Sequence, residues 1–424
     1  MPVTLNAHIV ATYLIETPLT LEAAAAVMAG EQSTGTFVRT ILETDALRAR
    51  HAATIEHIEP LGEVDSPSLS GSRGPRTSEP GRYARGRVTI SWPLENVGPS
   101  LPNLLATVAG NLFELRELSG ARLVDLHLPG AFADAYQGPA FGVDGTRALT
   151  GVATGPVLGT IVKPSVGLSP RETGALVAQL ATAGLDFIKD DELMANPPHS
   201  PLAERVTEVM AVLDRHAERT GKRVMYAFNI TDDIDQMRQH HDTVLAAGGT
   251  CVMVSLHSVG MTGLAYLRRH SQLPIHGHRN GWGIHTRHPL LGVEFTVMQR
   301  LWRLAGADHL HVNGLRNKFW EPDDSVIASA LSCLRPLFAD RPMVAMPAFS
   351  SGQRAKQAPE TLSRLGRDDL MYLCGGGIMA HPMGVEAGVA SIREAWDAAR
   401  SGIELTAYAA DHPALRAALA GEAG

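Results

Sequence analysis

Eight short apolar segments recur between residues 157 and 400, and each is followed by a stretch with helical character. The segments are 157–163, 185–190, 223–229, 250–255, 273–278, 308–312, 343–349 and 370–374. A strand–helix unit repeated eight times predicts a parallel sheet that closes into a (β/α)8 TIM barrel, a fold of about 250 residues. A doubly wound open sheet is the weaker alternative, because eight parallel strands in series close naturally.

The residues after the first segment show the local pattern of one such unit. Ser169 has the position of a helix N-cap, Pro170 that of the first helical residue, and Glu172 that of the reciprocal partner in a capping box. Gly184 can end this helix, and the next apolar segment begins at once. The pattern therefore predicts a βαβ unit.

The residues before the barrel mix strand and helix patterns. Strand alternation covers 7–17, helical patterns cover 19–30 and 101–118, and a Gly-, Ser- and Pro-rich loop covers 62–82. The fold class is therefore α/β, with an N-terminal α+β domain over 1–145 and a barrel domain over 146–424.

Charge and composition argue against two classes of function. Asp and Glu number 44 against 37 Lys and Arg, so no basic excess is available for nucleic acid. No apolar run reaches about 18 residues and the N-terminus alternates, so we expect neither a membrane span nor a signal peptide. Three widely spaced cysteines offer no disulfide framework and no zinc ribbon. We expect a cytoplasmic enzyme without nucleic-acid or membrane partners.

Polar residues gather where the predicted strands end, and a barrel places its active site at those carboxyl ends. They are Lys163, Lys189, Asp190, Asp191, Glu192, His276, His278, Arg279, His309, His311, Lys318, Ser350, Ser351, Gly352, Gly375, Gly376 and Gly377. We therefore expect these residues to surround one pocket.

The segment 189–192 has two interpretations. The period of a strand places Lys189 and Asp191 on one face and Asp190 on the other. One interpretation is an ordinary ion-paired lysine. The other is a magnesium site, because Asp191 and Glu192 supply the oxygen ligands that magnesium prefers. An ammonium group offers no ligand, so Lys189 could contribute only after CO2 converts it to a carbamate.

The remaining strand ends also leave alternatives open. Lys163 is either a lysine whose stem packs while its head reaches water or a desolvated amine for proton transfer. The paired histidines could be core residues or zinc ligands, but anion binding or proton transfer suits His278, Arg279 and His311 better. The glycines after the last two strands form either tight turns or a phosphate site.

In this order, the residues resemble the motifs of the RuBisCO large-subunit superfamily. The barrel motifs are GTIVKPSVGLSP (159–170), GLDFIKDDE (184–192), HGHR (276–279), DHLH (308–311), SSG (350–352) and CGGGIMAHPMG (374–384). Two earlier segments, EQSTGTF (31–37) and GNLFELREL (110–118), resemble those that reach into a partner's active site. The resemblance covers nearly the whole chain and implies the RuBisCO large-subunit fold.

The resemblance also implies a role for each matching residue. One Mg2+ per site would be held by carbamylated Lys189 with Asp191 and Glu192. The catalytic residues would be Lys163, Lys189, His278 and Lys318. Arg279, His311 and Ser350 would contact one anionic end of the substrate, whereas Thr36, Phe37, Lys318, Gly352, Gly375 and Gly376 would hold a phosphate at the other. Glu31 and Asn111 would come from the partner subunit, which implies a homodimer.

Several positions depart from the pattern of CO2-fixing carboxylases. Ser165 replaces a second lysine, Phe37 a tryptophan and Trp282 a histidine, while NGLRNKFWE (313–321) replaces VVGKLEGE. We also expect no long closing tail after Gly424. These departures predict a RuBisCO-like protein of form IV, of the non-photosynthetic branch, that does not fix CO2.

The resemblance thus implies magnesium-dependent enolate chemistry on a phosphorylated sugar or sugar acid. The NGLRNKF and SSGQ variants favour decarboxylation or hydrolytic cleavage of 3-oxo-isoapionate 4-phosphate. An isomerase or enolase acting on a methylthio-sugar phosphate in methionine salvage is the first alternative. A non-catalytic binding protein is the second, but the retained lysines and carboxylates argue against it.

Overall fold

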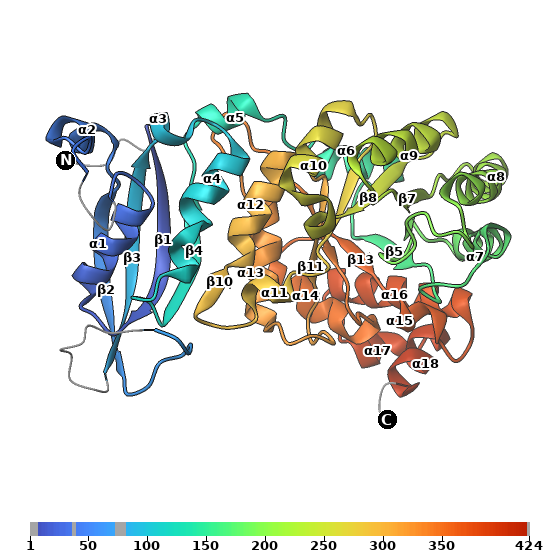
Figure 1. Cartoon of the computed structure of the whole chain (residues 1–424). Coiled ribbons are helices and arrows are strands. Elements are labelled where there is room, and N and C mark those ends of the chain that lie inside the picture. The colour runs from blue at the N-terminus through green and yellow to red at the C-terminus, as the bar shows by residue number, and fades with distance from the viewer. Residues whose placement is uncertain (1–6, 36–39, 73–81, 422–424) are drawn as a thin grey trace. The chain divides into compact units, whose positions relative to one another are not determined.

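A computed structural model describes residues 7–35, 40–72 and 82–421, which form two compact units (Figure 1). The first unit lies within residues 1–136 and 281–301, and the second within 137–280 and 302–424. Residues 281–301 thus belong to the first unit, although in the sequence they lie between the two parts of the second unit. Among the described residues, no helix is both long and apolar enough to cross a membrane.

The first unit is an α+β fold around a five-stranded sheet. Its elements are β1 (His8–Thr17), α1 (Leu21–Glu31), α2 (Asp45–His51), β2 (Thr54–Val64), β3 (Tyr83–Pro93), α3 (Leu94–Val97), α4 (Leu101–Ala109), η1 (Asn111–Glu114), β4 (Gly120–His127), α5 (Ala131–Ala135), α11 (Gly283–Thr286) and β10 (Leu291–Val293). The strand order is β10-β4-β1-β3-β2, and only the β10–β4 pair is parallel within the described sheet.

The first unit confirms the predicted strand over 7–17 and corrects the predicted helix over 101–118. In β1, Ile9, Ala11, Tyr13 and Ile15 are buried, as the alternation requires. The helix instead stops at Ala109, because Gly110 leaves the helical conformation with φ −73° and ψ −117°. A short 3-10 turn, η1, follows it.

The loop predicted over 62–82 begins later than expected. The strand β2 continues to Val64, so residues 62–64 belong to the sheet. Part of the expected loop, residues 73–81, lies outside the described residues.

The second unit is the predicted barrel. Its strands are β5 (Val157–Ile161), β6 (Phe187–Lys189), β7 (Met225–Asn229), β8 (Cys251–Ser255), β9 (Ile275–His278), β11 (His309–Asn313), β12 (Met346–Phe349) and β13 (Met371–Leu373). They close in the order β11-β12-β13-β5-β6-β7-β8-β9, with every neighbouring pair parallel. The open-sheet alternative is therefore wrong.

One helix precedes β5 along the chain, and the others follow barrel strands. They are α6 (Gly142–Thr150), α7 (Pro170–Thr182), α8 (Leu202–Thr220), α9 (Ile234–Ala246), α10 (Leu256–His270), α12 (Phe295–Ala305), α13 (Asp323–Leu334), η2 (Ala355–Gln357), α14 (Ala358–Leu365), α15 (Gly376–Met379), α16 (Val385–Arg400), α17 (Leu405–Ala409) and α18 (Pro413–Gly421). The capping box predicted for α7 is present, with Ser169 and Glu172 bonded reciprocally.

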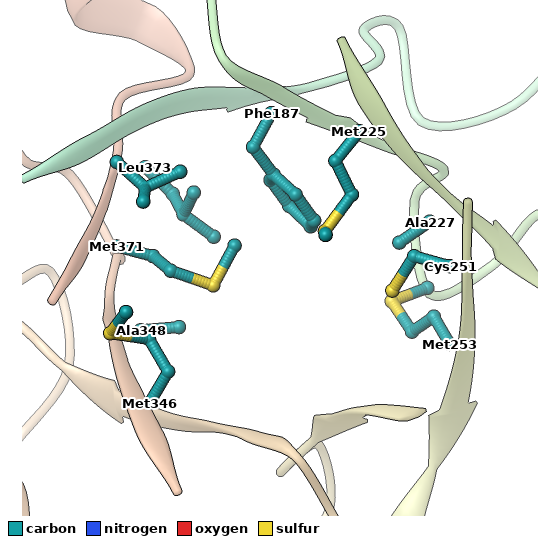
Figure 2. Close-up of a cluster of buried hydrophobic side chains, with 10 residues drawn as sticks. Phe187, Met225, Ala227, Cys251, Met253, Met346, Ala348, Met371 and Leu373 are labelled. Carbon is teal, nitrogen blue, oxygen red and sulfur yellow. The ribbon is translucent and has the colours of Figure 1, made fainter. Parts of the chain in front are cut away.

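The barrel interior is filled by apolar side chains. They are Val157, Phe187, Met225, Ala227, Cys251, Met253, Met346, Ala348, Met371 and Leu373, and each is buried (Figure 2). Figure 2 shows the labelled side chains reaching inward from the surrounding strands. This layer gives the barrel a packed core, so a ligand can reach only the residues at the strand ends.

Candidate functional site

Five predicted residues come together at the carboxyl ends of β5, β6 and β9. Lys163 Nζ donates to Asp191 Oδ2 over 2.6 Å. Glu192 Oε2 lies 4.0 Å from Lys189 Nζ and 3.5 Å from His278 Nε2. We call Lys163, Lys189, Asp191, Glu192 and His278 the β6 cluster. The strands bring these groups together from three separate segments of the chain.

Lys189 is the most deeply buried member of the β6 cluster. Its side chain is 0% exposed, and Nζ donates to the carbonyl of Asp190 over 2.8 Å. Burial lowers the pKa of Lys189 to about 8, although the carboxylates of Glu192 and Asp191 act in the opposite direction. About a tenth of the amine is therefore neutral at pH 7, far more than for an ordinary lysine, and the neutral amine is the form that reacts with CO2.

The donor set of the β6 cluster fits a hard divalent cation. With Lys189 as a carbamate, the cluster would hold three negative groups and the single positive charge of Lys163, and a divalent cation would neutralise the excess. All three negative groups present oxygen, the ligand that magnesium prefers. Hydrogen bonds from Lys163 and from the Leu193 N–H keep the pKa of Asp191 below its usual value despite the opposing effect of burial. Asp191 therefore stays ionised and able to bind a cation.

Lys163 lies at the edge of the β6 cluster, with its side chain 42% exposed. Besides Asp191, its ammonium group donates to Ser165 Oγ over 2.8 Å. Ser165 is the residue that replaces a second lysine in the compared carboxylase motif. Lys163 thus has access to a bound substrate, and a hydroxyl group beside it takes the place of a second positive charge.

Behind the β6 cluster lies a support network that the sequence analysis missed. Asp190 points away from Lys189, as the strand period predicts, and accepts hydrogen bonds from Tyr226 Oη at 2.6 Å and from Arg205 Nε at 3.2 Å. Arg205 also donates to the carbonyls of Met194, Ala195 and Ser200. These bonds fix the loop that follows β6.

Asn229 connects this network to the predicted metal ligands. Its backbone N–H donates to Asp190 Oδ2 over 2.9 Å, and its side-chain amide donates to the carbonyls of Asp191 at 3.1 Å and Glu192 at 3.2 Å. Asn229 thus holds the backbone of both ligand residues. The only sequence signal for it was its place at the end of a predicted strand.

A second polar cluster lies at the ends of β9, β11 and β12. Arg279 Nη2 contacts Glu321 Oε2 at 2.7 Å, and His311 Nδ1 lies 3.0 Å from Ser350 Oγ. Asn313 links the two groups, since its Nδ2 donates to Glu321 and its backbone carbonyl accepts from the Ser350 N–H over 2.9 Å. We call Arg279, His311, Asn313, Glu321 and Ser350 the β9 cluster. Glu321 was not predicted, although it ends the divergent segment NGLRNKFWE.

The histidines of both clusters are neutral. Burial lowers the pKa of His278 to about 4, and the positive charge of Lys189 acts in the same direction. Burial, reinforced by neighbouring histidines, also holds the pKa of His311 well below its usual value. His276 Nε2 lies 2.7 Å from His311 Nε2, and His309 Nε2 lies 2.8 Å from Thr146 Oγ1. His276 and His309 therefore behave as hydrogen-bonded core residues.

The predicted phosphate-binding turns follow β12 and β13. Lys318 N–H donates to the carbonyl of Ser351 over 3.1 Å, which ties the loop after β11 to the turn containing Gly352. A Cβ added at Gly376 would meet no atom within 4 Å, and at Gly375 it would only touch Ile161 Cδ1 at 4.0 Å. Packing does not require either glycine. Both leave open space beside the backbone, as a bound anion would need.

The predicted partner-completing residues belong to the first unit. Asn111 Nδ2 donates to Glu31 Oε1 over 3.0 Å, so the structure pairs these two residues with each other. Thr36 and Phe37 lie outside the described residues. The roles of these four residues therefore stay predictions.

One other group of possible metal ligands lies on α9 and α10. His241 Nδ1 and His270 Nε2 lie 2.9 Å and 2.6 Å from Asp242 Oδ1. The backbone N–H of Gln272 donates to His241 Nε2, which leaves the ring proton on Nδ1. His241 therefore donates to Asp242, and in this arrangement Nδ1 has no lone pair for a metal.

Comparison with known proteins agrees with the fold and with this placement of residues. The family profile "Ribulose bisphosphate carboxylase large chain, catalytic domain" matches residues 142–421, and the profile of the N-terminal domain of the same chain matches residues 3–132. The chain belongs to the RuBisCO large-chain family. The expected family and fold are therefore confirmed.

Similar members of the RuBisCO family are RuBisCO-like proteins. The "3-oxo-isoapionate-4-phosphate transcarboxylase/hydrolase" of Xanthobacter autotrophicus is 53% identical over 415 residues, which cover 98% of this chain and 99% of that protein. The "3-oxo-isoapionate-4-phosphate decarboxylase" of Rhizobium etli is 46% identical, with 96% and 97% covered. The crystal structure of a RuBisCO-like protein from Burkholderia fungorum superposes with a TM-score of 0.92 at 48% identity, with 98% and 99% covered.

Proposed function

We propose that this RuBisCO-family chain decarboxylates 3-oxo-isoapionate 4-phosphate, a phosphorylated β-oxo acid. The observation that carries the proposal is the β6 cluster, in which Lys163, Lys189, Asp191 and Glu192 converge at the carboxyl end of the barrel. Relatives that match nearly the whole chain are named for reactions on this compound. Hydrolytic cleavage of the same substrate is the second candidate, and the 53% identical relative supports it by its name.

Carbamylated Lys189, Asp191 and Glu192 would hold one Mg2+ in the proposed site. The cation would supply Lewis acidity that lowers the energy of an enolate beside it. Hydrogen bonds from Asn229 would keep the Asp191 and Glu192 ligands oriented while the substrate binds.

Decarboxylation of a β-oxo acid breaks one C–C bond, releases CO2 and leaves the electron pair in an enolate. The enolate carbon then needs a proton. Lys163 suits this step, because its ammonium group is partly exposed at the edge of the cluster. Asp191 accepts a hydrogen bond from Lys163 and so fixes the direction of the donor. Neutral His278 can hold a substrate hydroxyl without adding positive charge.

The phosphate of the substrate would bind to the turns that follow β12 and β13. The space where a Cβ would stand is open at Gly375 and Gly376 and nearly so at Gly352, so a phosphate could approach the backbone N–H groups there, and the Lys318 backbone is tied to the turn after β12 through Ser351. We propose a homodimer in which Glu31 and Asn111 complete the partner's site, and we propose that Thr36 and Phe37 help to hold the phosphate. Light scattering on the purified protein, with a monomer as the contrary result, tests the assembly.

The reaction can be tested directly on purified protein. Incubation with Mg2+, bicarbonate and 3-oxo-isoapionate 4-phosphate should release CO2 and leave one phosphorylated ketose, whereas hydrolytic cleavage would add water and give two acids. The Lys163→Met variant should lose about 10²–10⁴-fold in turnover, because it cannot transfer the proton. Lys356→Met, at an exposed lysine outside the cluster, is the matched control. Turnover of a methylthio-sugar phosphate instead would move the assignment to methionine salvage.

A further inference from the structure

The positive group of the β9 cluster, Arg279, is engaged by an acid from the same chain. Arg279 Nη2 contacts Glu321 Oε2 at 2.7 Å, with side-chain exposures of 10% for Arg279 and 4% for Glu321. Glu321 also accepts hydrogen bonds from Asn313 Nδ2 at 2.5 Å and from Ser325 Oγ at 2.8 Å. Both carboxylate oxygens are therefore bonded, and the carboxylate is fixed beside the guanidinium.

The other members of the cluster add no charge. His311 is neutral, because burial and its histidine neighbours oppose protonation, and Asn313 and Ser350 are uncharged. The cluster thus pairs one positive with one negative group and has no net positive charge. A buried arginine without such an acid would strongly attract a phosphate, which carries a charge between about −1.5 and −2 at pH 7.

We propose that Glu321 is a specificity-determining residue, which neutralises Arg279 so that this end of the site accepts a hydroxyl or a single carboxylate and rejects a second phosphate. The inference rests on the proposed function, because it concerns the substrate of the same site. A second phosphate at Arg279 would lie close to the fixed Glu321 carboxylate in a partly buried setting, where repulsion between like charges is strong. A hydroxyl brings no charge, and a carboxylate brings only about half the charge of a phosphate.

The loop after β11 therefore separates two kinds of anion recognition. The backbone of Lys318, in this loop, is hydrogen-bonded to the glycine-containing turn after β12. Glu321, three residues later, faces Arg279 at the end of β9. One phosphate would then bind at the glycine-containing turns, while the Arg279–Glu321 pair discriminates against a second one. This geometry selects a monophosphate.

Binding of non-reacting ligands tests the proposal without turnover. The ligands are a pentitol bisphosphate with a phosphate at each end and the corresponding pentitol monophosphate, measured by calorimetry with Mg2+ and bicarbonate present. The wild-type protein should bind the monophosphate at least as tightly as the bisphosphate. Tighter wild-type binding of the bisphosphate would overturn the proposal without the need for any variant.

The Glu321→Gln variant removes the charge and preserves the bonding. Its amide oxygen can accept from Arg279 and Asn313, and its NH2 group can donate to Ser325 Oγ, which is able to accept. This variant should bind the bisphosphate at least about tenfold more tightly than the wild type does. Its affinity for the monophosphate should change by less than about threefold. An unchanged ratio of the two affinities would contradict the proposal.

Two further variants separate charge from shape. Ser325→Ala removes a hydrogen bond to the same carboxylate without changing its charge, so the wild-type preference should remain. Glu321→Asp keeps the charge and should retain the preference as well. If the preference is as expected but 3-oxo-isoapionate 4-phosphate is not turned over, only the proposed reaction fails. If the reaction proceeds and Glu321→Gln changes no affinity, only the role of Glu321 fails.

Discussion

The β6 cluster and the β9 cluster both place charged side chains at the carboxyl ends of barrel strands, but they balance charge differently. In the β6 cluster, two carboxylates face a buried amine whose pKa is about 8 and a lysine that is 42% exposed. In the β9 cluster, Arg279 and Glu321 are both buried and paired with each other. The first arrangement can accept a cation once Lys189 becomes a carbamate, whereas the second has no group that can lose its positive charge in this way. Residue type alone therefore does not say which charged group is available to a ligand.

Replacing Lys189 should show the largest difference between the clusters. The Lys189→Met variant fills a similar apolar space but cannot form a carbamate, so we expect turnover to fall by at least about 10³-fold through loss of the cation. Mg2+ binding, measured by calorimetry with bicarbonate present, should weaken in parallel. Glu321→Gln is the comparison in the β9 cluster and should leave Mg2+ binding intact. Full activity of Lys189→Met would rule out the carbamate.

Asp190→Asn should show that the β6 cluster depends on the network behind it. The substitution leaves the buried Arg205 guanidinium without its negative partner, a change that typically costs about 3–5 kcal/mol of stability. Because Asp190 also orients Asn229, Mg2+ affinity should fall about 10–100-fold. Urea unfolding and calorimetry measure the two effects.

Tyr226→Phe is the graded control for Asp190→Asn. It removes one hydrogen bond to the same carboxylate but leaves the ion pair with Arg205, so we expect a smaller loss of about 1.5–3 kcal/mol. Unchanged Mg2+ affinity in Asp190→Asn would show that the network serves stability alone.

The barrel and the β6 cluster could be predicted from the sequence because both depend on local pattern. Apolar segments at regular spacing determine the strands, and Lys189, Asp191 and Glu192 follow one strand directly. Glu321 could not be predicted as the partner of Arg279, because the two residues are 42 positions apart and meet only when β9 and β11 pair. Arg205 and Asn229 were missed for the same reason. The end of α4 at Gly110 was missed because the apolar pattern continues past the glycine.

The smallest expected effect is a pH dependence of the free energy of unfolding. It comes from the buried, neutral histidines beside the β9 cluster. Burial lowers the pKa of His309 to about 3 in the folded protein, whereas in the unfolded chain it is about 6.5. Between these values the unfolded state binds more protons, so stability is complete above about pH 6.5 and falls as the pH drops. This single group contributes a slope that approaches about 1.4 kcal/mol per pH unit.

Urea unfolding at pH 7 and pH 5.5 checks this slope in the wild type and in His309→Gln. The glutamine can keep a hydrogen bond to Thr146 but does not titrate, so the variant should lose less stability on acidification than the wild type does. Equal losses in both proteins would mean that His309 is not the group responsible. The comparison bears on the β9 cluster, because His276 lies between His309 and His311, with its ring centroid 5.4 Å and 4.8 Å from theirs.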